Sequence, residues 1–91
     1  MDKLTIIRDE IDKIDDELID LLDRRLELAL KTATEKKKIK DLSRQKSIID
    51  RLNSYNKKNL DKTFINDLYK IIFKQSRKLQ KQKSIYIKTI K

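Results

Sequence analysis

The feature that most constrains this chain is a spacing of apolar residues near its N-terminus that alternates three and four. Its members are Leu4, Ile7, Ile11, Ile14, Leu18, Leu21, Leu22, Leu28 and Ala29. This is the period of an amphipathic helix with a coiled-coil-like seam. It predicts one helix from about Asp2 to Lys37, roughly 50 Å long at about 1.5 Å per residue. Because this helix is much longer than a globular domain of 91 residues requires, we expect it to pack along its length against a second chain.

Two further helices are predicted after the basic run at residues 36–40. Asp41 or Ser43 is the predicted N-cap of the second helix, which runs to about Asn56, and Asp61 is the predicted N-cap of the third. The turn between them begins with Asn56, a residue type that tolerates the left-handed conformation. The chain has no Gly and no Pro, the residues that most often interrupt helices.

The chain is short and highly charged, which limits how much it can bury. It has 91 residues, of which 43% are charged and 37% hydrophobic, enough for one helical seam but not for a thick monomeric core. We therefore predict an all-α fold with three helices per chain, and we expect helices of a partner to cover the seam. Residues 1–91 are expected to form a single domain, in which residues 81–91 either continue the third helix or form a frayed basic tail.

The missing residue types exclude several kinds of chemistry. Without Cys and His, the chain has no thiol nucleophile, no imidazole or thiolate metal site and no Ser-His-Asp triad. Without Gly, it has no glycine loop that could cradle a phosphate. Carboxylate-only binding of magnesium or calcium remains possible, although no EF-hand spacing is present. We expect neither a cofactor nor a metal. The sequence also has no apolar signal region and no apolar run long enough to span a membrane, so we expect a cytoplasmic protein.

The apolar seam is interrupted by polar residues in its second half. The next positions of the spacing are Arg25, Leu28, Thr32 and Lys36 (or Glu35). Arg25 and Lys36 lie about three turns apart and share a face. A buried base is costly unless it meets an anion. The alternative is that the long stems lie on the seam while the charged heads reach water. Two bases on one face favour an anion-binding pocket.

Polar residues on the other two helices could line the same pocket. Ser76 and Gln80 lie four residues apart, close to the apolar stripe of the third helix, and Asp41, Arg44 and Gln45 begin the second helix. The ordinary interpretations are a solvated helix edge for the first pair and a capped, exposed first turn for the others. In a bundle that places these residues opposite the seam, they would add hydrogen-bonding groups to the cavity.

Arg8 introduces a geometric constraint. It precedes Arg25 by 17 residues, roughly 25 Å along a straight helix. A metabolite-sized ligand cannot touch both side chains of one chain. If both serve the same kind of site, Arg8 must reach the site of a neighbouring subunit. Two antiparallel copies of the long helix would allow this, with two-fold symmetry and two equal sites.

Several stretches of the chain form a recognisable set when they are taken together. They are Ile7-Arg8-Asp9-Glu10-Ile11-Asp12 with Ile14-Asp15, residues 18–29 (LIDLLDRRLELA), Lys36, Asp41-Leu42-Ser43-Arg44, and Ile71-Ile72-Phe73-Lys74-Gln75-Ser76 with Gln80. Over roughly residues 4–80, this set resembles the all-helical chorismate mutases (chorismate mutase type II). Each piece alone is weak, but the set is specific.

The resemblance implies a fold and an activity. Members of this family form intertwined homodimers in which the long first helices pair and two sites are shared between chains. They convert chorismate to prephenate by a pericyclic Claisen rearrangement, on the route to phenylalanine and tyrosine. The reaction uses electrostatic and conformational stabilisation, with no covalent intermediate and no cofactor. The implied partners are a small-molecule substrate and a second copy of the chain, with no nucleic acid and no membrane.

The resemblance also implies roles for individual residues. Lys36 and Gln80 would be the catalytic residues at the ether oxygen of the substrate. Arg25 and Arg8 of the partner subunit would bind the two carboxylates, and Ser76 would assist. The remaining substrate-binding residues, around the ring hydroxyl, would be Arg44, Gln45 and the backbone at Asp41.

The chain departs from the family pattern in two places. Gln45 stands where a Glu is usual, which replaces a carboxylate acceptor with an amide. Because an amide still accepts a hydrogen bond, we expect weaker binding rather than inactivity. The stretch at residues 37–40 is short and rich in Lys, where many members have a longer loop with Pro.

Three other functions remain open at this stage. An isochorismate-pyruvate lyase would have the same fold and nearly the same ligand set. A basic helical dimer that binds nucleic acid would agree with the net charge of +9. Against it, the first helix is nearly balanced in charge, and the excess is dispersed over the later segments. A purely structural coiled-coil dimer would have no convergent site. We favour the mutase.

Overall fold

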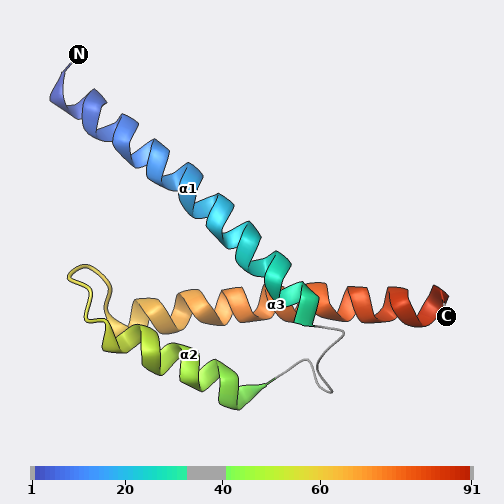
Figure 1. Cartoon of the computed structure of the whole chain (residues 1–91). Helices are drawn as coiled ribbons and strands as arrows, with labels where there is room; N and C mark the ends of the chain where they lie inside the picture. Colours follow the sequence, from blue (N-terminus) through green and yellow to red (C-terminus); the bar gives the residue numbers. More distant parts are fainter. Residues whose placement is uncertain (1, 33–40, 91) are drawn as a thin grey trace.

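The computed structural model describes the backbone of residues 2–32 and 41–90, and side chains through residue 83. Within these residues the fold consists of three helices and no strand: α1 (Lys3–Lys31), α2 (Leu42–Ser54) and α3 (Lys62–Ile90). The predicted all-α class with three helices is confirmed. As Figure 1 shows, α2 packs beside the first half of α3, and α1 crosses α3 near its own C-terminal end. No helix of the described part is long and apolar enough to cross a membrane.

Each helix begins in the same way, with an aspartate whose carboxylate accepts a hydrogen bond from the N–H group three residues further on. The three pairs are Asp2 with Thr5 (2.8 Å), Asp41 with Arg44 (3.0 Å) and Asp61 with Phe64 (2.8 Å). This is the N-cap bond that satisfies one of the free donors of a first helical turn. At Asp2 the bond from the Thr5 N–H lowers the pKa of the carboxyl. The predicted caps at Asp41 and Asp61 are confirmed.

The end of α1 differs from the sequence prediction. The helix ends at Lys31 with Thr32 as its C-cap, so the predicted end near Lys37 is wrong. At this end the Ala29 carbonyl accepts hydrogen bonds from the Thr32 hydroxyl, at 2.6 Å, and from the Thr32 backbone N–H. At 29 residues, α1 is roughly 43 Å long.

Helix α2 ends close to the predicted residue, and α3 extends through the C-terminal stretch. Helix α2 stops at Ser54 with Tyr55 as its C-cap, slightly before the predicted end at Asn56. Asn56 has a φ of 49°, the left-handed conformation that the sequence led us to expect in this turn. The sequence left open whether the C-terminal stretch continues the third helix or frays. The structure shows that it continues the helix, because α3 extends through Ile90.

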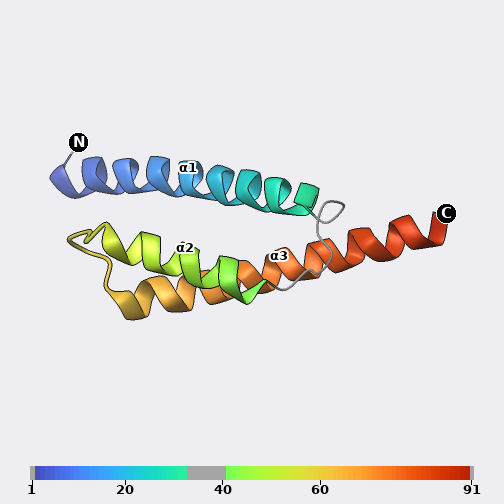
Figure 2. The same cartoon turned by 60° about the horizontal axis from the view of Figure 1, so that its bottom comes forward.

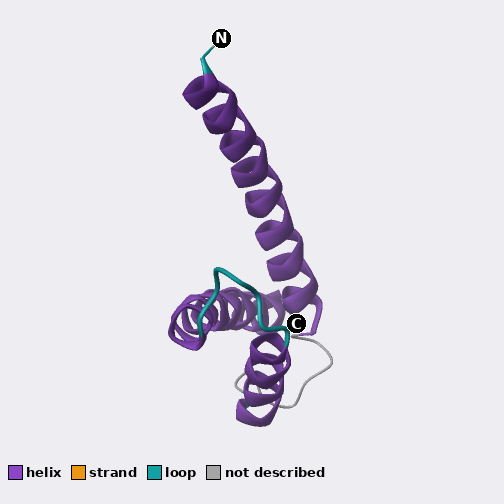
Figure 3. Ribbon diagram, turned by 90° about the vertical axis from the view of Figure 1, so that its left-hand side faces the viewer, coloured by secondary structure: helices purple, strands orange, loops and turns teal. Residues whose placement is uncertain are grey.

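The core of the described chain is small for its length. The buried apolar residues are Ile48 on α2 and Ile65 and Ile72 on α3, and α1 buries none of its residues. The chain extends over 59 × 30 × 16 Å, and the N-terminal half of α1 projects away from α2 and α3 (Figures 1 and 3). Figure 2 shows the same helices with α2 beside the first half of α3. The large apolar side chains of the predicted seam are exposed: Leu4, Ile7, Ile11, Ile14, Leu18, Leu21 and Leu28. Most of the seam therefore has no cover within the described chain, and only its members Leu22 and Ala29 are half-buried.

The N-cap of α3 provides a stability test. We expect Asp61→Ala to lower the free energy of unfolding by about 1 kcal/mol, because the Phe64 N–H loses its acceptor. Thermal or urea unfolding measures the change. Asp67→Ala is the matched control, since Asp67 is an exposed aspartate within the same helix, and its effect should stay within about 0.5 kcal/mol. Equal losses in the two variants would contradict this account of the cap.

Candidate active site

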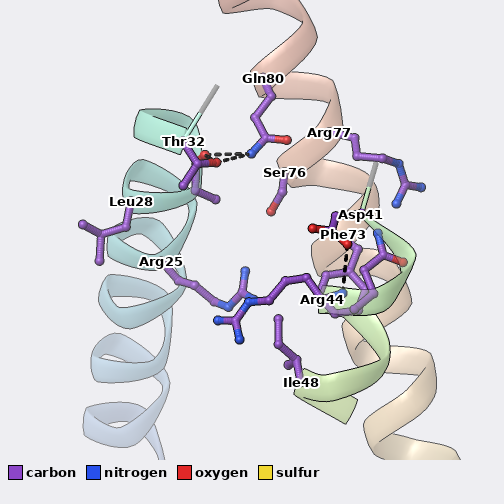
Figure 4. A pocket seen from close by; sticks show the side chains of 12 residues that line it. Arg25, Leu28, Thr32, Asp41, Arg44, Ile48, Phe73, Ser76, Arg77 and Gln80 are labelled. Atoms are coloured by element: carbon purple, nitrogen blue, oxygen red, sulfur yellow. Dashed lines mark hydrogen bonds between the residues drawn. The ribbon is translucent and has the colours of Figure 1, made fainter. Parts of the chain in front are cut away.

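A cavity of about 340 Å³ lies where the three helices meet, between the end of α1, the first turns of α2 and the second half of α3 (Figure 4). Its lining residues are Arg25, Leu28, Ala29, Thr32, Asp41, Arg44, Gln45, Ile48, Phe73, Ser76, Arg77 and Gln80. The volume is at the lower end of the range of small-molecule sites, about 300–1,000 Å³. The mixture of apolar walls with a few convergent polar groups is also typical of such sites.

The structure brings six of the eight predicted site residues to this cavity. They are Arg25, Asp41, Arg44, Gln45, Ser76 and Gln80. Arg8 is not among the lining residues; it is exposed on the projecting half of α1. Lys36 lies outside the described residues. The three helices of one chain therefore assemble most of the predicted set, while the roles of these residues stay predictions.

Two guanidinium groups dominate the charge of the cavity. Figure 4 shows Arg25 from α1 and Arg44 from α2 extending toward each other across it. The Arg25 guanidinium carbon lies 5.5 Å from the ring centroid of Tyr69 and 5.9 Å from that of Phe73. Stacking of this kind orients a cation by its attraction to the ring faces. Two positive groups that face each other attract an anion, because an anion between them relieves their repulsion.

The aromatic pair beneath Arg25 has a defined geometry. The Tyr69 and Phe73 rings are 5.7 Å apart and inclined by 63°, an edge-to-face contact. Both rings lie on α3, four residues apart, so one turn of this helix presents them together. The half-buried Arg25 is therefore held against α3, and its charged head lines the cavity.

The first turn of α2 supplies the opposite wall. The Asp41 carboxylate caps this turn through the Arg44 N–H, and Asp41, Arg44, Gln45 and Ile48 all line the cavity. The spacing of the last three places them on one face of α2. The N-cap thus fixes where the helix starts, and the start of the helix places the Arg44 backbone at the edge of the cavity.

Ser76 and Gln80 are the buried polar residues of the described chain, 8% and 2% exposed. The Ser76 hydroxyl donates to the Ile72 carbonyl at 3.0 Å. The Gln80 amide nitrogen, Nε2, donates to the Ala29 carbonyl at 2.7 Å and to Thr32 Oγ1 at 3.0 Å. The alternative of a solvated helix edge is therefore wrong for both residues, and Gln80 links α3 to the end of α1.

Sequence reasoning missed two polar residues of the cavity. Thr32 had been placed on the seam but given no role, and the half-buried Arg77 had not been singled out. A signal for Arg77 was available, because Phe73, Ser76, Arg77 and Gln80 follow the three–four spacing of one helical face. Figure 4 shows the Arg77 side chain pointing away from Arg25 and Arg44.

Comparisons with known proteins show which family the chain belongs to. Residues 7–81 match the family model of chorismate mutase type II. The crystal structure of chorismate mutase from Helicobacter pylori in complex with prephenate superposes with a TM-score of 0.81 at 41% identity, covering 87% of this chain and 90% of that one. The chain belongs to the type II chorismate mutase family.

Two curated relatives are longer proteins. The bifunctional chorismate mutase/prephenate dehydratases of Buchnera aphidicola subsp. Acyrthosiphon pisum (strain APS) and subsp. Schizaphis graminum (strain Sg) are 36% and 34% identical over 84 residues. In both cases the match covers 87% of this chain and 22% of the relative's length. The similarity to these proteins is thus to a part of each.

The link between Gln80 and α1 has a measurable contribution to stability. We expect Gln80→Ala to lower the free energy of unfolding by about 1–3 kcal/mol, since it removes two largely buried hydrogen bonds between helices. Thermal unfolding followed by circular dichroism measures it. Gln82→Ala is the matched control, because Gln82 is exposed on the same helix. If the two variants unfold at the same temperature, Gln80 does not stabilise the packing of α1 on α3.

Proposed function

We propose that this chain converts chorismate to prephenate in the cavity between its three helices. The observation that carries the proposal is the convergence of Arg25 and Arg44, from different helices, beside the buried Ser76 and Gln80. Chorismate is a dianion, so a cavity lined by guanidinium groups from two helices suits it electrostatically. Membership of the family supports the same reaction, as does the structural similarity to a chorismate mutase that was crystallised with prephenate.

The residues of the cavity suit a reaction that needs no nucleophile. In a pericyclic rearrangement the protein holds the substrate in the reactive conformation and stabilises the charge that grows on the breaking C–O bond. In our proposal Arg25 binds a carboxylate with help from Ser76, and Arg44, Gln45 and the backbone at Asp41 hold the ring side. Lys36 and Gln80 donate hydrogen bonds to the ether oxygen.

The complete site requires a second chain in this proposal. The exposed seam of α1 is a continuous apolar face, and such faces on small helical proteins are usually covered by a partner. We propose an intertwined homodimer in which two copies of α1 pair antiparallel along this seam. Arg8 of the partner subunit then reaches the cavity and binds the second carboxylate. Two-fold symmetry makes the two sites equal.

A direct assay tests the proposed function. The purified protein should convert chorismate to prephenate, and Lys36→Ala should lower kcat by about 10²–10³-fold, the loss typical of removing one preorganised donor. Lys78→Ala is the control, because Lys78 is an exposed lysine of α3 that does not line the cavity. This control should keep wild-type turnover.

Two results would contradict the proposal. The first is unchanged turnover in Lys36→Ala. The second is a protein that leaves chorismate unchanged but cleaves isochorismate to salicylate and pyruvate, which would make it the lyase of the same fold.

A further inference from the structure

We infer that Thr32 competes with the substrate for an amide proton of Gln80, and that this competition slows the reaction. The inference rests on the proposed function, in which Gln80 donates to the ether oxygen. Thr32 does not itself contact the reacting atoms in this proposal. It is a positioning residue that acts through Gln80.

The first step is the orientation of the Gln80 amide. One end of the amide lies 2.7 Å from the Ala29 carbonyl oxygen, and the side chain is 2% exposed. A carbonyl oxygen only accepts hydrogen bonds. The end that faces α1 must therefore be the nitrogen, Nε2, and the alternative amide orientation would place two acceptors in contact.

The second step concerns the Thr32 hydroxyl. Its oxygen lies 2.6 Å from the same Ala29 carbonyl, so it donates its single proton there. Toward Gln80 Nε2, at 3.0 Å, the hydroxyl can then only accept. Both protons of Nε2 are consequently engaged, one on the Ala29 carbonyl and the other on Thr32 Oγ1.

The third step concerns which atom of the Gln80 amide remains available to a ligand in the cavity. Figure 4 shows the nitrogen of Gln80 turned to Thr32 and the oxygen turned away from it. With both protons engaged on α1, the group that is left to the cavity is the amide oxygen, which accepts but cannot donate. Negative charge that develops on an ether oxygen needs a donor. Gln80 must therefore give up one of its two bonds before it can assist the reaction.

The bond to Thr32 is the one that is given up more easily. It is longer than the bond to Ala29, 3.0 Å against 2.7 Å, and it ends on a neutral hydroxyl rather than on a carbonyl at a helix C-terminus. Thr32 also occupies a seam position of α1, where the three–four spacing calls for an apolar side chain. A valine at this position keeps the branched shape and removes the acceptor.

The experiment compares kcat and KM for chorismate in the wild type, Thr32→Val and Thr32→Ser. We expect Thr32→Val to raise kcat about threefold to tenfold, because the hydrogen bond between Gln80 and Thr32 no longer has to be broken to reach the transition state. This factor corresponds to the net free energy of one hydrogen bond. KM should change less than kcat. Thr32→Ser retains the hydroxyl and should behave as the wild type. Thr63→Val makes the same replacement at an exposed site on α3 and serves as the control.

A double-mutant cycle isolates the role of Gln80. In the Gln80→Ala background, adding Thr32→Val should leave kcat unchanged, since no amide proton remains to be released. The inference is overturned if Thr32→Val equals Thr32→Ser in kcat, or if it lowers kcat. A gain that persists without the Gln80 amide also overturns it. A wild type without turnover would instead refute the proposed function.

A second measurement needs no substrate and no activity. In ¹⁵N-labelled protein, one of the two Gln80 Nε2 protons should exchange with water faster in Thr32→Val than in the wild type, by about tenfold, because its acceptor is gone. The backbone amide spectrum of the same sample reports whether the variant is folded. Equal exchange of both protons in the two proteins would overturn the inference even if the activity assays fail.

Discussion

The contact on which the rest of this structure depends is the docking of the Gln80 amide on the last turn of α1. Helix α1 has no fully buried residue, and its half-buried apolar residues, such as Leu26 and Leu30, all lie in its C-terminal half. The bonds from Gln80 to the Ala29 carbonyl and to Thr32 tie its C-terminal end to α3. They also close one end of the cavity. Because Arg25 lies just one to two turns before this contact, the position of the first guanidinium follows from it.

The second constraint is electrostatic. Arg25 rests on two aromatic rings of α3, so its charge is held by the fold before any ligand arrives. Arg44 stands in the first turn of α2, which the Asp41 cap fixes, and extends toward Arg25. Facing guanidinium groups repel each other, and an anion bound between them relieves the repulsion. The net charge of +9 raises the local concentration of such anions. Among the described residues, the polar groups of the cavity thus stand on the faces and ends of helices.

Much of this arrangement could be predicted from local rules. The caps at Asp41 and Asp61, the left-handed Asn56 and the six residues that line the cavity depend on side-chain chemistry and helical spacing, which the sequence displays directly. The end of α1 could not be predicted in this way, because the three–four spacing continues beyond Thr32 and no Gly or Pro marks the end. Nor could local spacing predict that Thr32 is a hydrogen-bond partner of Gln80, because the two residues are 48 positions apart in the sequence.

The central claim is that each site combines the cavity of one chain with Arg8 of the partner subunit. Mixing two inactive variants tests it most directly. Arg8→Ala and Arg25→Ala homodimers would each lack one cation in both sites, whereas a mixed dimer would have one site with both changes and one with neither. After unfolding and refolding together at equal concentration, the mixture should recover about a quarter of wild-type activity, because half of the dimers are mixed and each has one intact site. A mixture that stays as inactive as its components would contradict a site shared between chains.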